Sequence, residues 1–377
     1  MKNVTFVALV IICIATFGGI FFLNQRQPAV VIPKTTTETG AVAVNTPSGQ
    51  ISAPLSGREI AAVTTTGITL LAPNTEKVSS ADAPLSYQTI GHIDISHTVS
   101  AIAWSGDTLY WTEERAVSDS ASAQGSTAFV LVACRFEQLN CSPVDQTIVK
   151  HAIVRIIPDT TNTFLGLLDD ANDFFVYTIA QGEIKRISQD VVGATFLPGK
   201  LSVVVAAEQE PQPVTTYYEL SKTAEVKSTT VVPGTFGGFG VTALNEAEVL
   251  GVSWGKGAEG VVQRLRLSTN TVTDIGSVTF LKDGATLPSG VSPLPQLIVN
   301  PKKTDVLVRL PRLAQVIFTL ESATARGMTE TEDFVDFIDD SSYATIIDST
   351  LFSVGVQSGI QTRLAGDVVL SAVRATK

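Results

Sequence analysis

The chain has 377 residues, of which 44% are hydrophobic and 16% are charged, and its formal net charge is −10. A hydrophobic content of this size is enough for a packed core, which excludes a chain that is disordered throughout. The acidic balance excludes a general affinity for phosphate backbones, so we expect no nucleic acid as a partner.

Residues 1–26 predict a membrane anchor. The 20 residues from Val4 to Leu23 carry no charge and no proline, and a helix of that length, rising ~1.5 Å per residue, crosses a ~30 Å hydrocarbon core. A cleaved signal peptide is the main alternative. Its apolar run is shorter and ends in small residues, whereas here the run continues from Ile20 to Leu23 beyond Gly18. We therefore expect an uncleaved, single-pass transmembrane helix that acts as a signal-anchor.

Residues 27–56 predict a flexible linker. This stretch is rich in Thr, Ser, Pro and Ala and has no sustained hydrophobic period, which is typical of a disordered tether. Fully extended at ~3.3 Å per residue, it would reach on the order of 100 Å. Such a stalk suits the display of residues 57–377 away from a membrane.

Cys134 and Cys141 predict a disulfide bond and hence an oxidising compartment. They are the only cysteines outside the apolar segment, and the chain between them can double back as a hairpin that brings them within disulfide range. Charges beside the helix decide its orientation poorly, because Lys2 is nearly balanced by Arg26 and Lys34. Two free buried thiols in a cytosolic domain stay open as the alternative, because spacing does not establish pairing. We expect the C-terminal domain to be extracytoplasmic, at the cell surface or in a periplasm.

From Arg58 onward the sequence predicts an all-β domain. Short apolar or alternating runs rich in Val, Ile, Thr and aromatic residues are separated by Gly, Pro, Asn and Asp, as strands and turns require. No sustained helical period follows the linker. This absence excludes a doubly wound α/β fold, because parallel strands need crossover connections that usually carry helices.

The predicted strands recur in groups, each with an apolar opening strand, a polar turn, a more strongly apolar strand and a polar hairpin. The groups begin near Val99, Ala152, Gly193, Gly240, Gln296 and Phe334. Their spacing averages 47 residues and suits four-stranded propeller blades of ~40–50 residues. With a part-unit from Arg58 to Thr98, we expect a seven-bladed propeller whose ring closes by pairing strands from the two chain ends. Tandem β-sandwiches are the alternative fold.

One segment resembles a known propeller family. Leu109-Tyr110-Trp111-Thr112-Glu113 resembles a single repeat of the YWTD-type propellers, with Glu in place of the final Asp and with one copy in the chain. The resemblance implies a propeller that serves as an extracellular binding platform. Tyr110 and Trp111, together with Trp104, are expected to pack in the core rather than to contact a ligand.

Two motifs imitate catalytic or cofactor sites around Ser253. Gly251–Gly255 matches the G-x-S-x-G turn of α/β-hydrolases, and Gly255, Gly257 and Gly260 match the G-x-G-x-x-G of dinucleotide sites. Both motifs need a helix to follow, but the next residues alternate as a strand. The required histidine after the serine is also missing, because the only histidines are His92, His97 and His151. We expect a glycine-rich hairpin.

Two further sets of residues suggest metal ions. His92, Asp94 and His97 are potential ligands, but on a strand His97 points away from the other two. The acidic stretches 169–173 and 333–340 invite a calcium interpretation, yet they lie between apolar runs, where Asp and Asn favour tight turns. We expect a polar strand and turns, with no metal site and no cofactor.

These observations predict a membrane-anchored extracytoplasmic binding module, with a protein or glycan partner and no identifiable catalytic residue. Two alternatives stay open. One is a hydrolase or lyase that uses a carboxylate pair in the channel of the propeller. The other is a structural component of an envelope assembly.

Overall fold

The computed structural model describes most of the residues after the predicted linker, all within the unit Gly40–Lys377. They are residues 57–74, 86–117, 126–135, 140–149, 151–208, 212–238, 240–254, 259–279, 296–310, 314–327, 333–356 and 358–374. The predicted membrane helix and linker lie outside these ranges. Within the ranges, no helix has the length and apolar character needed to cross a bilayer.

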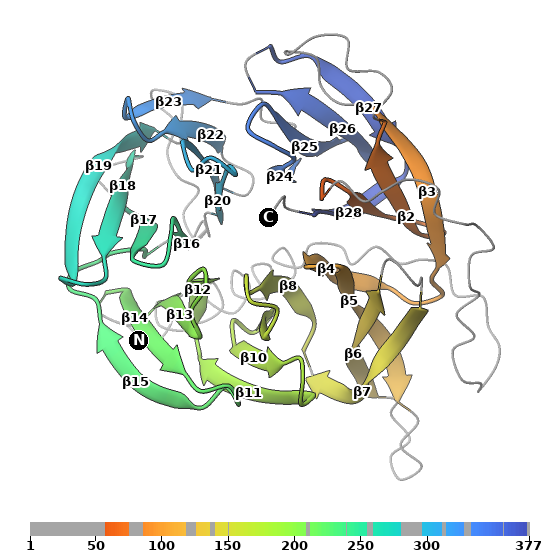
Figure 1. Ribbon diagram of the computed structural model, residues 1–377, viewed down its shortest axis with the longest axis horizontal. Coiled ribbons are helices and arrows are strands. Elements are labelled where there is room, and N and C mark those ends of the chain that lie inside the picture. The colour runs from red at the N-terminus through yellow and green to blue at the C-terminus, as the bar shows by residue number, and fades with distance from the viewer. Residues whose placement is uncertain are drawn as a thin grey trace, which may run out of the picture. The chain divides into compact units, whose positions relative to one another are not determined.

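The described residues form seven four-stranded antiparallel sheets that surround a common axis (Figure 1). This arrangement is a seven-bladed β-propeller. It confirms the predicted all-β fold and the predicted blade number, and it excludes the tandem β-sandwiches.

The strands of each blade are given from the axis outward. Blade 1 contains β28 (Val368–Val373), β1 (Ile60–Thr64), β2 (Gly67–Pro73) and β3 (Tyr87–Asp94). Blade 2 contains β4 (Val99–Ser105), β5 (Thr108–Val117), β6 (Ser126–Arg135) and β7 (Asn140–Val149). Blade 3 contains β8 (Ile153–Pro158), β9 (Phe164–Asp169), β10 (Phe174–Thr178) and β11 (Glu183–Ser188). Blade 4 contains β12 (Val191–Phe196), β13 (Ser202–Ala207), β14 (Val214–Leu220) and β15 (Val226–Val231).

The last three blades follow the same plan. Blade 5 contains β16 (Val241–Ala243), β17 (Glu248–Trp254), β18 (Glu259–Arg266) and β19 (Thr271–Thr279). Blade 6 contains β20 (Gln296–Val299), β21 (Asp305–Leu310), β22 (Ala314–Thr319) and β23 (Thr324–Gly327). Blade 7 contains β24 (Asp333–Phe337), β25 (Ser342–Ile347), β26 (Thr350–Gly355) and β27 (Gln361–Ala365).

Apolar clusters fill all seven interfaces between neighbouring blades. The second strand of a blade contributes to two of them, because successive side chains point to opposite faces. On β21, Val306 and Val308 pack toward blade 5, whereas Leu307 packs toward blade 7. Burial on both faces explains why these second strands are continuous apolar runs in the sequence.

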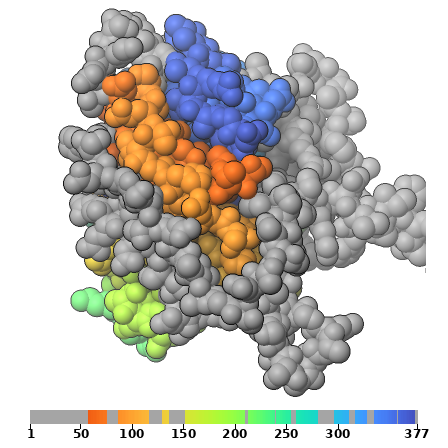
Figure 2. Space-filling model, turned by 90° about the vertical axis from the view of Figure 1, so that its right-hand side faces the viewer, coloured from red at the N-terminus to blue at the C-terminus, as the bar shows by residue number. Residues whose placement is uncertain are grey.

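The ring closes where the two ends of the domain meet, as predicted. β28 pairs with β1 and so supplies the innermost strand of blade 1. Figure 2 shows the C-terminal residues, in blue, against the N-terminal residues of the domain, in orange. We call this junction the seam.

Arg374 fastens the seam. Its Nη1 lies 2.9 Å from Oε2 of Glu59, whose side chain is fully buried, and its Nε donates to the carbonyl of Gly106 at 3.0 Å. Nη2 also pairs with Asp107, and the guanidinium lies 5.8 Å from the ring centroid of Trp104. One side chain thus joins the N-terminal end of the domain, the C-terminal end and blade 2.

Several turns that follow the inner strands are fixed by an Asp or Asn. Oδ1 of this residue accepts a hydrogen bond from a backbone amide further along the turn, which is the usual role of Asx turns. The bonds run from Thr163 N to Asp159, from Ala247 N to Asn245, from Thr304 N to Asn300 and from Ser341 N to Asp339. Two of these turns, at Asn245 and Asn300, border the site described next.

Candidate functional site

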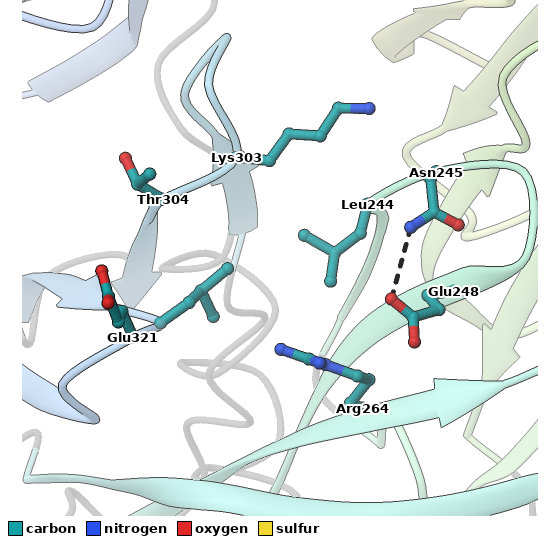
Figure 3. Close-up of a pocket in the computed structure, with 8 residues that line it drawn as sticks. Leu244, Asn245, Glu248, Arg264, Lys303, Thr304 and Glu321 are labelled. Atoms are coloured by element: carbon teal, nitrogen blue, oxygen red, sulfur yellow. Dashed lines mark hydrogen bonds between the residues drawn. The ribbon is translucent and has the colours of Figure 1, made fainter.

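A cleft of about 300 Å³ lies between blades 5 and 6. This volume is at the lower end of the range for small-ligand pockets. Figure 3 shows its lining, which combines four charged side chains with polar and apolar ones: Leu244, Asn245, Glu248, Arg264, Lys303, Thr304, Leu320 and Glu321.

Strand alternation brings the blade 5 side chains to the cleft. Arg264 on β18 pairs with Leu250 on β17, and Val262 lies two residues before Arg264. Leu250 and Val262 belong to the apolar cluster shared with blade 6, so Arg264 shares the face that points toward blade 6. The apolar interface therefore ends in a charged residue, whose guanidinium extends into the space between the blades (Figure 3).

The charged groups of blade 5 differ in how they are paired. Oε2 of Glu248 accepts a hydrogen bond from Asn245 at 3.3 Å, and its Oε1 lies 3.6 Å from Arg266. By contrast, Nε of Arg264 is buried and makes no hydrogen bond with the described part of the chain. A buried donor without a partner costs ~1–3 kcal/mol, so Arg264 lowers the stability of the interface beside the cleft.

Lys303 faces the cleft from a rigid turn of blade 6. Its φ of 61° is left-handed, which is uncommon for a residue with a side chain. Asn300 holds this turn, because its Oδ1 accepts from Thr304 N at 2.9 Å and its carbonyl accepts from Lys303 N at 2.9 Å. The Lys303 side chain extends toward the blade 5 turn that carries Asn245 (Figure 3).

Apolar packing joins the described residues of blades 5 and 6 beneath the cleft. Between the described residues of the two blades we find no hydrogen bond or ion pair, whereas Leu244 and Leu320 meet in the shared apolar cluster. The cleft can therefore offer cations and an apolar wall to a ligand at the same time.

A second group of charged side chains lies on the inner strands, which surround the channel of the propeller. Burial raises the pKa of Asp336, on the inner strand β24, to about 7, although the Phe337 amide and Arg155 oppose the shift. Burial lowers the pKa of Arg155, on the inner strand β8, which Asp336 opposes and Arg309 reinforces. Among inner-strand side chains that the structure describes, Asp336 is the single carboxylate. The acid–base pair of the hydrolase alternative is therefore not found there, and we base no proposal on it.

Ser253 lies in the middle of a hairpin, as predicted. It is a β17 residue paired with Val261 of β18, and only 4% of its surface is exposed. Gly260 belongs to β18, whereas Gly255 and Gly257 lie outside the described residues. A strand therefore follows the serine, in place of the helix that both motifs require.

His92 and Asp94 share one face of β3, with 3.4 Å between Nε2 and Oδ1. Nδ1 of His92 lies 3.2 Å from Oγ1 of Thr69. Three or more metal-ligating side chains do not converge anywhere in the described ranges. The polar-strand interpretation accounts for these contacts.

The acidic stretch from Asp169 to Asp173 forms a tight turn between β9 and β10. Oδ1 of Asp169 accepts from the amides of Ala171 and Asp173, and Asn172 adopts a left-handed φ of 64°. Asp339 plays a similar part after β24, where it accepts from Ser341. The predicted turn chemistry is confirmed for Asp169 and Asp339. It is wrong for Asp336, which lies on the strand β24. Asp333 belongs to the same strand, and its side chain lies outside the described part.

Cys134 and Cys141 face each other across β6 and β7 in the strand register. Directly opposed residues of an antiparallel pair have Cα atoms ~4.5–5.5 Å apart, which falls within the disulfide range. The hairpin that the prediction required is therefore present.

The segment resembling a YWTD repeat lies on β5, the second strand of blade 2. Trp111 is buried, and its Nε1 donates to Glu113 at 2.8 Å, while Arg115 also pairs with Glu113 at 2.8 Å. Trp104 and Tyr110 are buried as well. These rings pack in the core, as expected.

The cleft was not predicted from the sequence, although the arrangement of arginines on one strand indicates it. Arg264 and Arg266 alternate on one face of a strand whose earlier residue on that face, Val262, is fully buried. Two cations at successive positions of a core-facing row indicate that the apolar interface opens there.

Comparisons with known proteins support the fold. No family model matches the sequence, and no curated protein matches it. Among solved structures, the chain is similar to a protein from Lactobacillus plantarum, with 14% identity, coverage of 85% of this chain and 99% of that chain, and a TM-score of 0.50.

Two further structures are more distant. TolB from Acinetobacter baumannii is 11% identical, with coverage of 87% of this chain and 68% of that chain and a TM-score of 0.46. The WD40 repeats of RRP9 are 8% identical, with coverage of 74% and 82% and a TM-score of 0.46. The likeness to the Lactobacillus plantarum protein, at 14% identity, shows the fold alone, and the YWTD resemblance stays a prediction.

Proposed function

We propose that this chain is a binding module that displays its propeller outside the cytoplasm on a membrane anchor and engages a protein partner. The observation that carries the binding role is the cleft between blades 5 and 6, where Arg264 and Lys303 have no partner among the described residues beside the apolar Leu244 and Leu320. Protein surfaces offer acceptors and apolar side chains together, which makes a protein the best match to this lining.

The placement rests on the sequence. The uncharged run from Val4 to Leu23 is long enough to span a bilayer, and residues 27–56 have the composition of a tether. The facing positions of Cys134 and Cys141 support a disulfide bond and thus an oxidising compartment.

Two measurements test the placement. In the native host, the full chain should sediment with membranes, and protease added outside the cytoplasmic membrane should remove the propeller. Mass spectrometry of the non-reduced protein should find Cys134 linked to Cys141. A chain recovered from the cell interior with both thiols alkylatable would overturn the proposed location.

A pull-down tests the binding role. The full chain, solubilised in mild detergent, should recover a protein partner from envelope extract, and Arg264→Gln should weaken that recovery. Arg363→Gln, at an exposed position of β27, is the matched control and should behave as wild type. Recovery of a glycan, or of no partner under broad conditions, would contradict the proposal.

A further inference from the structure

The two cations of the cleft are available to a ligand because the neighbouring acid is occupied. Glu248 is engaged by both Asn245 and Arg266, so it does not neutralise Arg264. The guanidinium of Arg264 makes no hydrogen bond or ion pair with any described residue, and its Nε is buried. An acceptor placed in the cleft would pair with the terminal nitrogens of this guanidinium, which extends into the space between the blades (Figure 3).

The net charge of the residues around the cleft favours a ligand with a single negative charge. Arg264 and Lys303 supply two positive charges, the Glu248–Arg266 pair is neutral, and Glu321 adds one negative charge on the blade 6 side. The balance is one positive charge, which matches a carboxylate better than a doubly charged phosphate. The planar fork of an arginine also fits a carboxylate in a bidentate manner.

The apolar residues specify what accompanies the carboxylate. Leu244 is buried and Leu320 is half-buried, and both line the same small cleft. A volume of about 300 Å³ is sufficient for one apolar side chain together with a carboxyl group. The C-terminal residue of a protein chain presents these two groups on the same carbon.

We propose that the cleft between blades 5 and 6 captures the free C-terminal carboxylate of a partner protein whose last residue is apolar. Arg264 and Lys303 bind the carboxylate, and Leu244 and Leu320 contact the terminal side chain. This assignment rests on the proposed binding function and names the ligand class for it.

The test measures binding of short labelled peptides to the full chain in detergent by fluorescence anisotropy. A peptide ending in a free Leu carboxylate should bind. Amidation of that terminus, or Asp in place of the terminal Leu, should weaken binding by about tenfold or more. Arg264→Gln and Lys303→Gln should each weaken it by a similar factor, while Arg363→Gln leaves it unchanged and all variants keep the wild-type melting temperature.

Competition separates the possible sources of the negative charge. Acetylated leucine, which keeps the carboxylate and the side chain, should displace the peptide, and inorganic phosphate at the same concentration should not. Equal binding of the amidated and free peptides, or displacement by phosphate alone, would overturn the proposal. If a protein partner is recovered in the pull-down but binds Arg264→Gln as well as wild type, the binding function stands and the carboxylate site falls.

Discussion

Neighbouring blades are joined in different ways at the seam and at the cleft. At the seam, Arg374 bonds to Glu59, Gly106 and Asp107, so charged groups that are removed from water are paired. At the cleft, apolar packing joins blades 5 and 6, and Arg264 keeps a buried donor without an acceptor.

The inner strands at the seam and at the cleft also differ in length. β28 at the seam has six residues, whereas β16 and β20 beside the cleft have three and four. Shorter inner strands leave fewer rows of side chains to fill the space between two blades. The comparison indicates that charged contacts hold the two ends of the domain together at the seam, whereas blades 5 and 6 leave a space that we propose holds a ligand.

The largest effect is expected when the seam is broken. Arg374→Ala removes the partner of a fully buried Glu59, and loss of one member of a buried ion pair costs about 3–5 kcal/mol. Chemical denaturation of the propeller should show this loss in the free energy of unfolding. Arg363→Ala, exposed on β27, should change it by less than about 0.5 kcal/mol. Equal stability of the two variants would mean that the seam is held by strand pairing alone.

A slightly smaller loss in the free energy of unfolding is expected when a buried side chain is truncated in the apolar interface under the cleft. Leu250 is fully buried between blades 5 and 6, and Leu→Ala in a packed core costs about 2–5 kcal/mol. Val226→Ala, at a position of β15 that is 45% exposed, is the control. Because no polar contact between described residues supports this interface, a cost near zero for Leu250→Ala would show that the two blades do not depend on it.

A smaller effect on stability is expected from the titration of Asp336 in blade 7, which borders the seam. It should appear when stability is measured as a function of pH. Burial raises the pKa of Asp336 to about 7, whereas an unfolded Asp titrates near pH ~3.9. Between these values the folded state binds more protons, so stability should fall as pH rises from about 4 to about 7 and then level off.

Asp336→Asn removes this titration. Because Asp336 is only partly covered from solvent, we expect the variant to be more stable than wild type at pH 8 by about 1–2 kcal/mol, with little difference at pH 4. Melting temperatures measured across that range check the sign. A variant that is less stable at pH 8 would show that the Arg155 contact outweighs the cost of burying the charge.

Sequence reasoning located the blades because each one repeats the same physical pattern. The predicted starts near Ala152, Gly193 and Gly240 lie within two residues of the observed inner strands β8, β12 and β16. The polar turn and the doubly buried second strand mark each unit even where the residues differ.

The cleft could not be located in the same way. It depends on which residues of β18 meet the turns of blade 6, and those turns lie some 40 residues further along the chain. The row formed by Arg264 and Arg266 indicates an opening in the interface, but it does not identify Lys303 or Leu320 as the facing residues. Arg374 was missed for a related reason, since its partners are hundreds of residues away in the sequence.

The smallest effect on stability is expected at Arg264, where the same substitution should also abolish binding of the ligand. Arg264→Met replaces a buried donor without a partner by an apolar side chain of similar length beside Leu250 and Val262. Removing an unsatisfied group should raise the free energy of unfolding by up to about 1 kcal/mol, while binding of a peptide with a free C-terminal Leu is lost. Denaturation and anisotropy on the same preparation measure both. A variant that is destabilised by more than about 1 kcal/mol would place Arg264 among the residues that hold the ring together, as Arg374 does, rather than among those that are kept for a ligand.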